Sequence, residues 1–471
     1  MLALRPYQES IKLAARQSFA SGNKAVLIQL ATGGGKTVIF ADIMGGMARN
    51  NKTCMLLVHR VELLNQASRA LFKMGIDHSY IASGVKMKKS NVYVASVGTL
   101  VSRIRKGIEI PTPDLLITDE AHHATAGQWR MVSTYFNTKH LGVTATPIRT
   151  DGKGLDEIFQ DMISGEDHGA SMADLIEAGY LSRYQAFSHP KARDFQEVRM
   201  KGADYDPKEL EEQLKGIMGS EVIEYSKHSP GRPAIAFYPT VAMAEMGAEK
   251  FRDAGYNFIS VDGSMSSTDR KDAINGLASG KYQGLTNCSI ISEGTDIPVV
   301  DTIIDMQKTK SLSLYLQKMG RGLRTHPDKT HATLIDMVGN IGLHGLPCDR
   351  REWSLEGIKR RKKKKETEVR ITQCDQCSNH FETKQRQCPK CGWKIPPGEP
   401  REEVVLNGEL VSVSPEFFAV HDRAVKEQKK KEQREATTEE QLIELGRSRG
   451  YRNPEGWAYN IMKSRRNKRW G

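Results

Sequence analysis

Residues 25–37 read AVLIQLATGGGKT, and residues 38–48 continue as VIFADIMGGMA. The apolar run at the start favours a buried strand, and the periodic segment at the end favours a helix. Glycines lie between them, and they allow backbone N–H groups to surround phosphate oxygens at the start of that helix. The segment therefore predicts a phosphate-binding loop at the carboxyl end of a strand, where open α/β sheets bind their ligands.

The loop also carries the side chains that ATP and Mg²⁺ require. Lys36 can reach the outer phosphates, and the hydroxyl of Thr37 can ligate Mg²⁺. The longer form of this motif has glycine where this chain has Leu30. A glycine-rich loop of another kind is the alternative. The residues expected to hold the nucleotide in this loop are Thr32, Gly33, Gly34, Gly35, Lys36 and Thr37.

A second segment, DLLITDEAHH at residues 114–123, places two carboxylates directly after an apolar strand. A metal-bound phosphate at the strand end can meet both of them. We expect Asp119 to hold Mg²⁺ and Glu120 to polarise the attacking water. Either carboxylate alone could cap a helix, but two halves of a phosphate site rarely occur in this order by chance. Together the two segments predict ATP hydrolysis.

Short apolar runs alternate with helical patterns on both sides of these segments. The first series consists of AVLIQL, CMLLVH, NVYVASV, DLLITDE and HLGVTATP. The second begins near Arg232 and consists of PAIAFYP, FISVDGS, YQGLTNCSI, VVDTIIDM and HATLIDM. Such alternation predicts an α/β fold with a parallel sheet in each half. Residues 151–185 interrupt the rhythm, so we expect them to link two domains.

Length and composition agree with two domains and smaller appendages. The chain has 471 residues, which is too many for one ordinary core. No apolar run reaches the roughly 18 residues that a membrane span needs. The start, MLALRPYQES, lacks the layout of a secretory signal. We therefore expect a cytoplasmic protein, of a bacterium or of a phage-infected host cell.

Positive charge is concentrated near the end of the chain. The formal net charge is +12, and residues 346–471 contain 29 Lys and Arg against 20 Asp and Glu. Residues 1–345 are nearly neutral, so we expect the electrostatic footprint for a polyanion in the last quarter of the chain. A solvated linker is the alternative for the run 359–365.

Four of the seven cysteines form two CxxC pairs within CDQCSNHFETKQRQCPKCGW. Two such pairs separated by ten residues are typical of a zinc ribbon with a small β-hairpin. A redox role or a coincidence is the alternative, and His380 is expected to be a bystander. Surrounding lysines and arginines favour nucleic acid over protein as the partner of the ribbon. The expected ligands of one structural Zn²⁺ are Cys374, Cys377, Cys388 and Cys391.

Taken in order, the motifs of residues 1–345 resemble those of superfamily 2 helicases of the DEAD/DEAH-box kind. LRPYQES resembles the adenine-reading element, LVHRVELLNQ motif Ia, SVGTL motif Ib and TATP motif III. FYPTVAMAE, TNCSIISEGTDIP and QKMGRGLR resemble motifs IV, V and VI. Each motif alone is a weak signal, whereas the series is specific. With the Cys-rich module, LRPYQ, EGTDIP and GRGLR are also similar to RadD-like helicases and phage-type relatives.

This resemblance implies two tandem RecA-like domains that share one ATP site. Gln8 would contact the adenine, with Arg5 or Tyr7 packed nearby, and Gly294 with Asp296 would contact the nucleotide from the second domain. The second domain would also supply Gln317, Arg321 and Arg324 to the γ-phosphate. An arginine in that position is worth on the order of 10³ to 10⁵ in rate. A solvent-facing helix end is the alternative for the two arginines.

The resemblance also implies a path for nucleic acid and its coupling to hydrolysis. His122, Thr144 and Thr146 would couple the nucleotide site to that path. Contacts to the phosphate backbone carry little sequence preference, as a motor that walks on any sequence requires. The residues expected to make these contacts are His59, Arg60, Ser96, Thr99, Thr286 and Asn287.

We interpret the chain as an ATP-dependent helicase or translocase that acts on nucleic acid, with single-stranded, forked or branched DNA favoured in repair or recombination. A clamp with degenerate hydrolysis and a motor subunit of a restriction or remodelling complex are the alternatives. A capped helix is expected to begin at Thr437 or Thr438, and the ribbon or tail is a possible site for a protein partner. The expected divisions are an ATP-binding domain at 1–150, a linker at 151–185, a helicase C-terminal domain at 186–345, a basic linker at 346–370, the ribbon at 371–396 and a charged helical region at 397–471.

Overall fold

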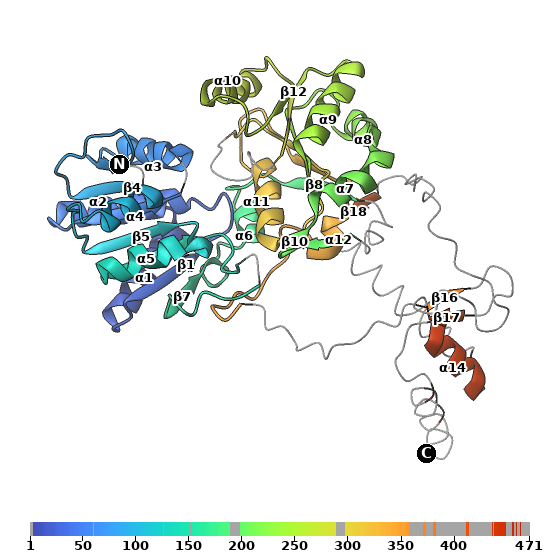
Figure 1. Ribbon diagram of the computed structural model, residues 1–471, viewed down its shortest axis with the longest axis horizontal. Helices are drawn as coiled ribbons and strands as arrows, with labels where there is room; N and C mark the ends of the chain where they lie inside the picture. Colours follow the sequence, from blue (N-terminus) through green and yellow to red (C-terminus); the bar gives the residue numbers. More distant parts are fainter. Residues whose placement is uncertain are drawn as a thin grey trace. The chain divides into compact units, whose positions relative to one another are not determined.

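The computed structural model forms two compact units, residues 1–411 and residues 412–471. The first unit contains two parallel sheets with their helices (Figure 1). Within the part of the chain that is described, no helix is both long and apolar enough to cross a membrane. The structure describes residues 3–59, 61–125, 127–149, 152–188, 198–288, 297–357, 371–373, 380–382, 411–413, 436, 438–448, 455, 458 and 462.

The first sheet confirms the five strands expected between Ala25 and Thr144. All of its strand pairs are parallel, so the carboxyl ends of its strands meet at one edge. Its strand order is β3 (Ser79–Ile81), β4 (Val92–Ser96), β2 (Cys54–Val58), β5 (Leu115–Asp119), β6 (Lys139–Thr144), β1 (Ala25–Gln29) and β7 (Asp161–Ser164). The strand β1, which precedes the glycine loop, is completely buried between β6 and β7.

Helices cover both faces of this sheet because successive side chains of a strand point to opposite faces. Leu56 and Val58 share one core with the first three helices, whereas Met55 and Leu57 share another with the next two. The helices are α1 (Pro6–Ala20), α2 (Lys36–Arg49), α3 (Val61–Lys73), α4 (Val97–Arg105) and α5 (Gly127–Phe136). A short 3₁₀ helix, η1 (Ala121–His123), follows β5.

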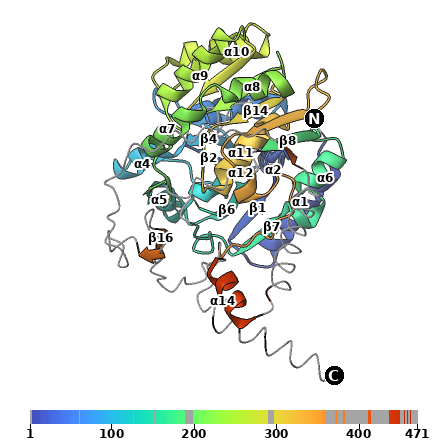
Figure 2. The ribbon, with the colours of Figure 1, turned by 90° about the vertical axis from the view of Figure 1, so that its right-hand side faces the viewer.

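The second sheet is also parallel, as the second series of apolar runs predicted. Its consecutive pairs are β12 (Phe258–Val261), β13 (Gly284–Asn287), β11 (Ala234–Phe237), β14 (Thr302–Asp305), β15 (Ala332–Asp336) and β8 (Tyr184–Ser188). Figure 2 places α8 (Ser220–His228) and α9 (Val241–Asp253) on one side of β14, and α11 (Leu312–Gly322) with α12 (Asn340–His344) on the other. The remaining elements here are β9 (Met200–Lys201), β10 (Asp204–Tyr205), α7 (Pro207–Leu214), η4 (Lys215–Ile217) and α10 (Ser267–Ala278).

Residues 151–185 are more than the linker that the sequence predicted. They include β7, which pairs with β1 in the first sheet, then η2 (Gly165–His168) and α6 (Met172–Glu177), and they end in β8 of the second sheet. The side chain of Gln29 in β1 accepts hydrogen bonds from the hydroxyl of Ser164 and the amide of Gly165. The four-residue strand was too short for its apolar pattern to be recognised in the sequence.

The segment after the second sheet also differs from the predicted basic linker at 346–370. Its first part returns to the first domain, where the amide of Leu155 donates to the carbonyl of Leu355 over 2.7 Å. Lys153 and Gly357 form an antiparallel bridge. At Gly154 a Cβ would collide with the backbone of residues 355–357, so the two segments approach as closely as glycine allows. Residues 346–357, here called the return segment, therefore belong to the folded motor domains.

Little of the region beyond residue 357 is described. A short antiparallel pair consists of β16 (Ile371–Gln373) and β17 (His380–Glu382), and β18 covers Val411–Val413. The helix α14 (Glu439–Ser448) begins as expected, because the hydroxyl of Thr438 accepts a hydrogen bond from the Gln441 amide. The Cys374, Cys377, Cys388 and Cys391 ligands expected for zinc lie outside the described residues.

Candidate active site

The glycine loop lies between β1 and α2, as the sequence predicted. Gly33 and Gly35 have φ values of +83° and +82°, which side chains rarely permit. Gly35 immediately precedes the first residue of α2, so the loop leads into a helix N-terminus. Lys36 and Thr37 form the first turn of that helix and are partly exposed.

The element that is expected to contact adenine is hydrogen-bonded to this loop. The Tyr7 hydroxyl and the Gln8 side-chain amide both donate to the carbonyl of Gly34, over 2.7 and 3.2 Å. A Cβ on Gly35 would lie 2.5 Å from the amide nitrogen of Gln8, so a larger residue at this position would displace the Gln8 side chain. Burial raises the pKa of Tyr7, which therefore stays a neutral donor. The side chain of Gln8 therefore contacts the glycine loop directly.

Tyr180, an aromatic residue outside the predicted site, packs against Arg5 and Tyr7. The guanidinium of Arg5 lies over the ring of Tyr180, 3.9 Å from its centroid. The rings of Tyr7 and Tyr180 are 5.8 Å apart. Flat groups of this kind suit a nucleobase. Tyr180 stands in the segment that was interpreted as a linker, and no pattern in the sequence connects it to residues 5–8.

The two carboxylates follow each other at the end of β5. Asp119 is the last residue of the strand, and its carboxylate accepts a hydrogen bond from the Glu120 amide over 3.0 Å. Glu120 has φ 49° and ψ 54°, the left-handed region that costs a residue with a Cβ on the order of 1–3 kcal/mol. Its Oε2 lies 3.4 Å from Nδ1 of His122. The turn after β5 therefore holds both carboxylates at the loop edge of the sheet.

The three residues expected to couple the sites do meet. Nδ1 of His122 lies 3.2 Å from the hydroxyl of Thr144, which in turn donates to the carbonyl of Thr146 over 3.0 Å. The hydroxyl of Thr146 donates to the hydroxyl of Ser313 over 2.6 Å. All four side chains are buried. Because Ser313 lies in the first turn of α11, this chain of contacts runs from the carboxylates into the second domain.

The helix α11 carries Gln317 and Arg321 and packs directly against the phosphate loop. A Cβ on Gly320 would lie 2.5 Å from Cγ2 of Thr32. Gln317 and Arg321 are both buried, and Arg324 follows the helix and is partly exposed. The structure therefore brings α11, which bears Gln317 and Arg321, against the glycine loop.

A buried ion pair holds α11 in this place. Lys318 and Asp305 are both completely buried, with Nζ 2.6 Å from Oδ1. The side-chain amide of Asn340 donates to the other carboxylate oxygen of Asp305 over 2.8 Å. Nζ of Lys318 also donates to the carbonyl of Gln307. No pattern in the sequence identifies this ion pair, because a lysine in a helix pattern ordinarily indicates an exposed position.

The residues expected to contact nucleic acid divide into two groups. His59 directly follows β2, Ser96 is the last residue of β4, and Thr99 lies in the first turn of α4. All three residues are partly exposed. Thr286 and Asn287, by contrast, are completely buried in β13, where they donate to the carbonyls of Ala244 and Ala236. This corrects the prediction for these two, since buried side chains that are bonded to the backbone do not reach a phosphate. Arg60, Gly294 and Asp296 lie outside the described residues.

The loop and the carboxylates fit ATP and Mg²⁺. The hydroxyl of Thr32 is buried and has no hydrogen-bond partner among the described residues, although a buried hydroxyl normally has one. Thr37 and Asp119 supply oxygen donors, which are the ligands that Mg²⁺ prefers. Across the described ranges, no group of three or more His, Cys, Asp or Glu could hold a metal by itself.

The fold and the site define a two-domain ATP-hydrolysing motor of the RecA-like kind. The chain matches the families described as Type III restriction enzyme, res subunit, over residues 1–149, and Helicase conserved C-terminal domain, over residues 213–326. It is 32% identical over 394 residues to the 51.5 kDa protein of a Lactococcus phage (isolate 7-9), which covers 83% of this chain and 82% of that protein. The chain belongs to the superfamily 2 helicases.

Two further similarities extend this result. Identity is 30% over 369 residues to IRC3 of Saccharomyces cerevisiae, provisionally named an ATP-dependent helicase; the match covers 73% of this chain but only 53% of IRC3. The fragment structure of an HsdR subunit of a type I restriction enzyme from Vibrio vulnificus YJ016 has the same fold, with a TM-score of 0.56 at 20% identity. That match covers 72% of this chain and 66% of the fragment.

Proposed function

We propose that this ATP hydrolase is a DNA helicase or translocase whose ATP site is shared between its two domains. The observation that carries the proposal is the packing of Gly320 in α11 against Thr32 in the phosphate loop. It joins α11, which bears Arg321, to the loop that is expected to bind phosphate. In a motor, hydrolysis that requires both domains can drive their relative movement.

Each side chain of the site has a distinct part in this reaction. Lys36 binds the outer phosphates, and Glu120 polarises the attacking water and accepts its proton. As the bond from the water oxygen to the γ-phosphorus forms, the bond from that phosphorus to the bridging oxygen breaks, and ADP leaves with the electron pair. Bound Mg²⁺, held through Thr37 and Asp119, would neutralise phosphate charge. Arg321 and Arg324 would stabilise the charge that develops on the transferred group, with Gln317 placing the water.

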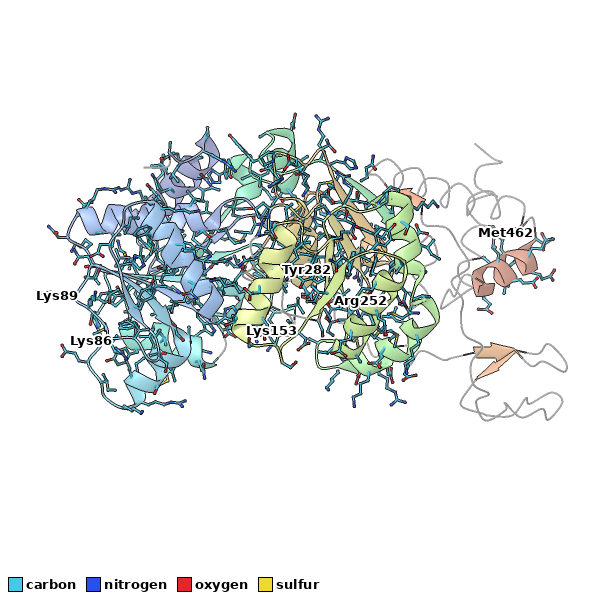
Figure 3. All side chains as sticks on the ribbon, turned by 90° about the horizontal axis from the view of Figure 1, so that it is seen from above. Lys86, Lys89, Lys153, Arg252, Tyr282 and Met462 are labelled. Carbon is cyan, nitrogen blue, oxygen red and sulfur yellow. The ribbon has the colours of Figure 1, made fainter. Side chains whose placement is uncertain are left out.

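Charge on the first domain supports nucleic-acid binding by the motor itself. Residues 84–108 contain six basic side chains and no acidic one. These side chains fall into two groups, at residues 86–89 and 103–106. Arg103 at the end of α4 contacts Met87 in the loop before β4, so the two groups are neighbours. Lys86 and Lys89 extend from the outer edge of the first domain in Figure 3. The six basic residues are Lys86, Lys88, Lys89, Arg103, Arg105 and Lys106.

DNA is favoured over RNA because the matched family and the HsdR fragment are parts of restriction enzymes. The same names favour a second candidate, a motor subunit of a larger DNA-processing complex. The first candidate, a helicase or translocase that acts by itself, would unwind DNA or migrate branches in repair or recombination. A cytoplasmic location, where ATP and DNA are both present, belongs to either.

Zinc in the ribbon is a separate proposal. Four thiolates at Cys374, Cys377, Cys388 and Cys391 would complete a tetrahedral structural site that leaves no position open for catalysis. The ribbon and the charged region after it would then bind DNA or a protein partner.

The test is ATP hydrolysis by the full chain with single-stranded, duplex, forked and four-way DNA, and with RNA. DNA should stimulate turnover, and Lys36→Ala should remove the signal in every case. Stimulation by RNA alone would overturn the choice of DNA. Stimulation by duplex DNA without strand separation would favour translocation and the subunit role, which a pull-down with the purified chain then examines.

A further inference from the structure

Three imidazole rings connect Glu120 to the edge of the first domain that was predicted to meet nucleic acid. His122 and His123 lie in η1, and His59 directly follows β2. The ring centroids of His122 and His123 are 4.2 Å apart, and those of His123 and His59 are 5.0 Å apart. His123 is therefore the ring that contacts both of the others.

The two ends of this series have different surroundings. At one end, Nδ1 of His122 lies 3.4 Å from the carboxylate of Glu120 and 3.2 Å from the hydroxyl of Thr144. At the other end, His59 is partly exposed at the carboxyl end of its strand. A contact made at His59 is thus two ring contacts away from the group that polarises water.

A tryptophan supports the middle of the series. The indole of Trp129 in α5 is stacked with His123, with 6.5 Å between centroids and 18° between planes. It also contacts His59, at 6.3 Å. Trp129 is itself buried in the core with α4. Because packed interiors yield little, a displacement of His59 against this wall is passed to His123.

We propose that His123 is a positioning residue that transmits nucleic-acid binding at His59 to Glu120 through His122. The inference rests on the proposed function, because it requires that His59 contacts nucleic acid. It is independent of the Thr146–Ser313 hydrogen bond, which leads to the second domain instead. Packing of a flat ring carries the effect, so a flat apolar ring should replace histidine here.

The test compares His123→Ala, His123→Phe and His123→Asn in the full chain. The measured quantity is the ratio of kcat with saturating forked DNA to kcat without DNA, which does not depend on the fraction of folded protein. Alanine and asparagine should lower this ratio by roughly two- to thirtyfold, the range found for coupling through packed side chains. Phenylalanine should restore most of it. KM for ATP and the Kd for DNA should stay within about twofold, as expected when only the coupling is lost.

A matched control is His78→Ala. His78 is partly exposed in the same domain and contacts the Tyr80 ring and the Ser68 hydroxyl, away from the site. This variant should keep the wild-type ratio. An unchanged ratio in His123→Ala, or a loss in His123→Phe as large as in His123→Ala, would overturn the inference. A wild-type chain that neither binds DNA nor responds to it would instead overturn the proposed function.

Discussion

Glu120 combines a strained backbone with the water-polarising role that we propose for it. A glycine would occupy φ 49° without strain, yet the carboxylate is needed there because it meets His122 and follows Asp119. The turn thus retains a conformation that costs stability, on the order of 1–3 kcal/mol, at the position where chemistry requires a side chain.

Glu120→Gln should leave ATP binding nearly intact and reduce turnover by roughly 10²- to 10⁴-fold, because an amide occupies the same space but cannot accept the proton. Lys36→Ala should instead weaken ATP binding, since it removes the cation from the phosphates. Nucleotide titration and steady-state hydrolysis separate the two effects. Full turnover in Glu120→Gln would remove this residue from the mechanism.

His140 gives the first domain a pH dependence. It is completely buried against Phe159 and Thr118, and burial lowers its pKa from 6.5 to about 4. Below pH 6.5 the unfolded chain binds a proton that the folded chain excludes. The stability that neutral His140 contributes is therefore present above pH 6.5 and is lost as the pH falls toward 4.

The loss should be roughly 3 kcal/mol over that interval, at about 1.4 kcal/mol per pH unit for one proton. Unfolding measured between pH 7 and pH 5 should show this slope in the wild-type chain. His140→Gln, which cannot titrate, serves as the comparison and should have the smaller slope. Equal slopes would mean that His140 is protonated in the folded state.

At the scale of elements, the strands could be predicted and several contacts between them could not. AVLIQL is apolar except for Gln29, and DLLITD has the apolar run LLI before Thr118, so the sequence alone placed both chemical motifs at strand ends. The edge strand β7 has four residues, and a pattern of that length indicates nothing by itself. Tyr180 and Ser313 reach the site only through tertiary packing, which no local pattern records. Thr286 was misjudged because a polar residue in a motif was assumed to face its ligand.

Gly320→Ala should lower kcat because the added Cβ meets Thr32 and separates α11 from the loop. Thr32→Ser removes the methyl group that lies nearest, so the double variant should recover part of the loss. Steady-state hydrolysis of the four proteins gives the coupling, which for residues in contact is typically 0.5–3 kcal/mol. Strict additivity would show that the two residues do not meet during turnover.

Metal analysis of the full chain should give one zinc per chain. Cys388→Ser with Cys391→Ser should lose it, because two remaining thiolates do not complete a tetrahedral site. ATP hydrolysis without DNA should persist in that variant. Stoichiometric zinc in the double variant would show that other residues are the ligands.

At the scale of the whole molecule, the return segment extends the folded motor domains from residue 345 to residue 357. A chain that stops at Gly345 would lose Leu355, which packs against the buried Leu155 and Phe159. A chain that stops at Gly357 keeps that contact and loses residues 358–471, which hold 27 Lys and Arg against 17 Asp and Glu.

The chain ending at Gly357 should hydrolyse ATP normally without DNA, but its DNA affinity should fall and depend less on salt. Each lost phosphate contact lowers the log–log salt slope by roughly 0.9 for duplex DNA. Affinity for one forked DNA, measured from low to moderate salt in both chains, gives the number of contacts. An unchanged slope would assign the tail to a protein partner and leave the cluster at residues 84–108 as the main DNA contact.

The return segment also connects the two domains a second time. The chain enters the second sheet at β8 and returns to the first domain at Leu355, so two separate backbone segments connect the two domains. Two domains joined by a single linker can rotate relative to each other about any axis. Two linkers restrict this freedom, and they favour rotation about the axis that passes through both connections.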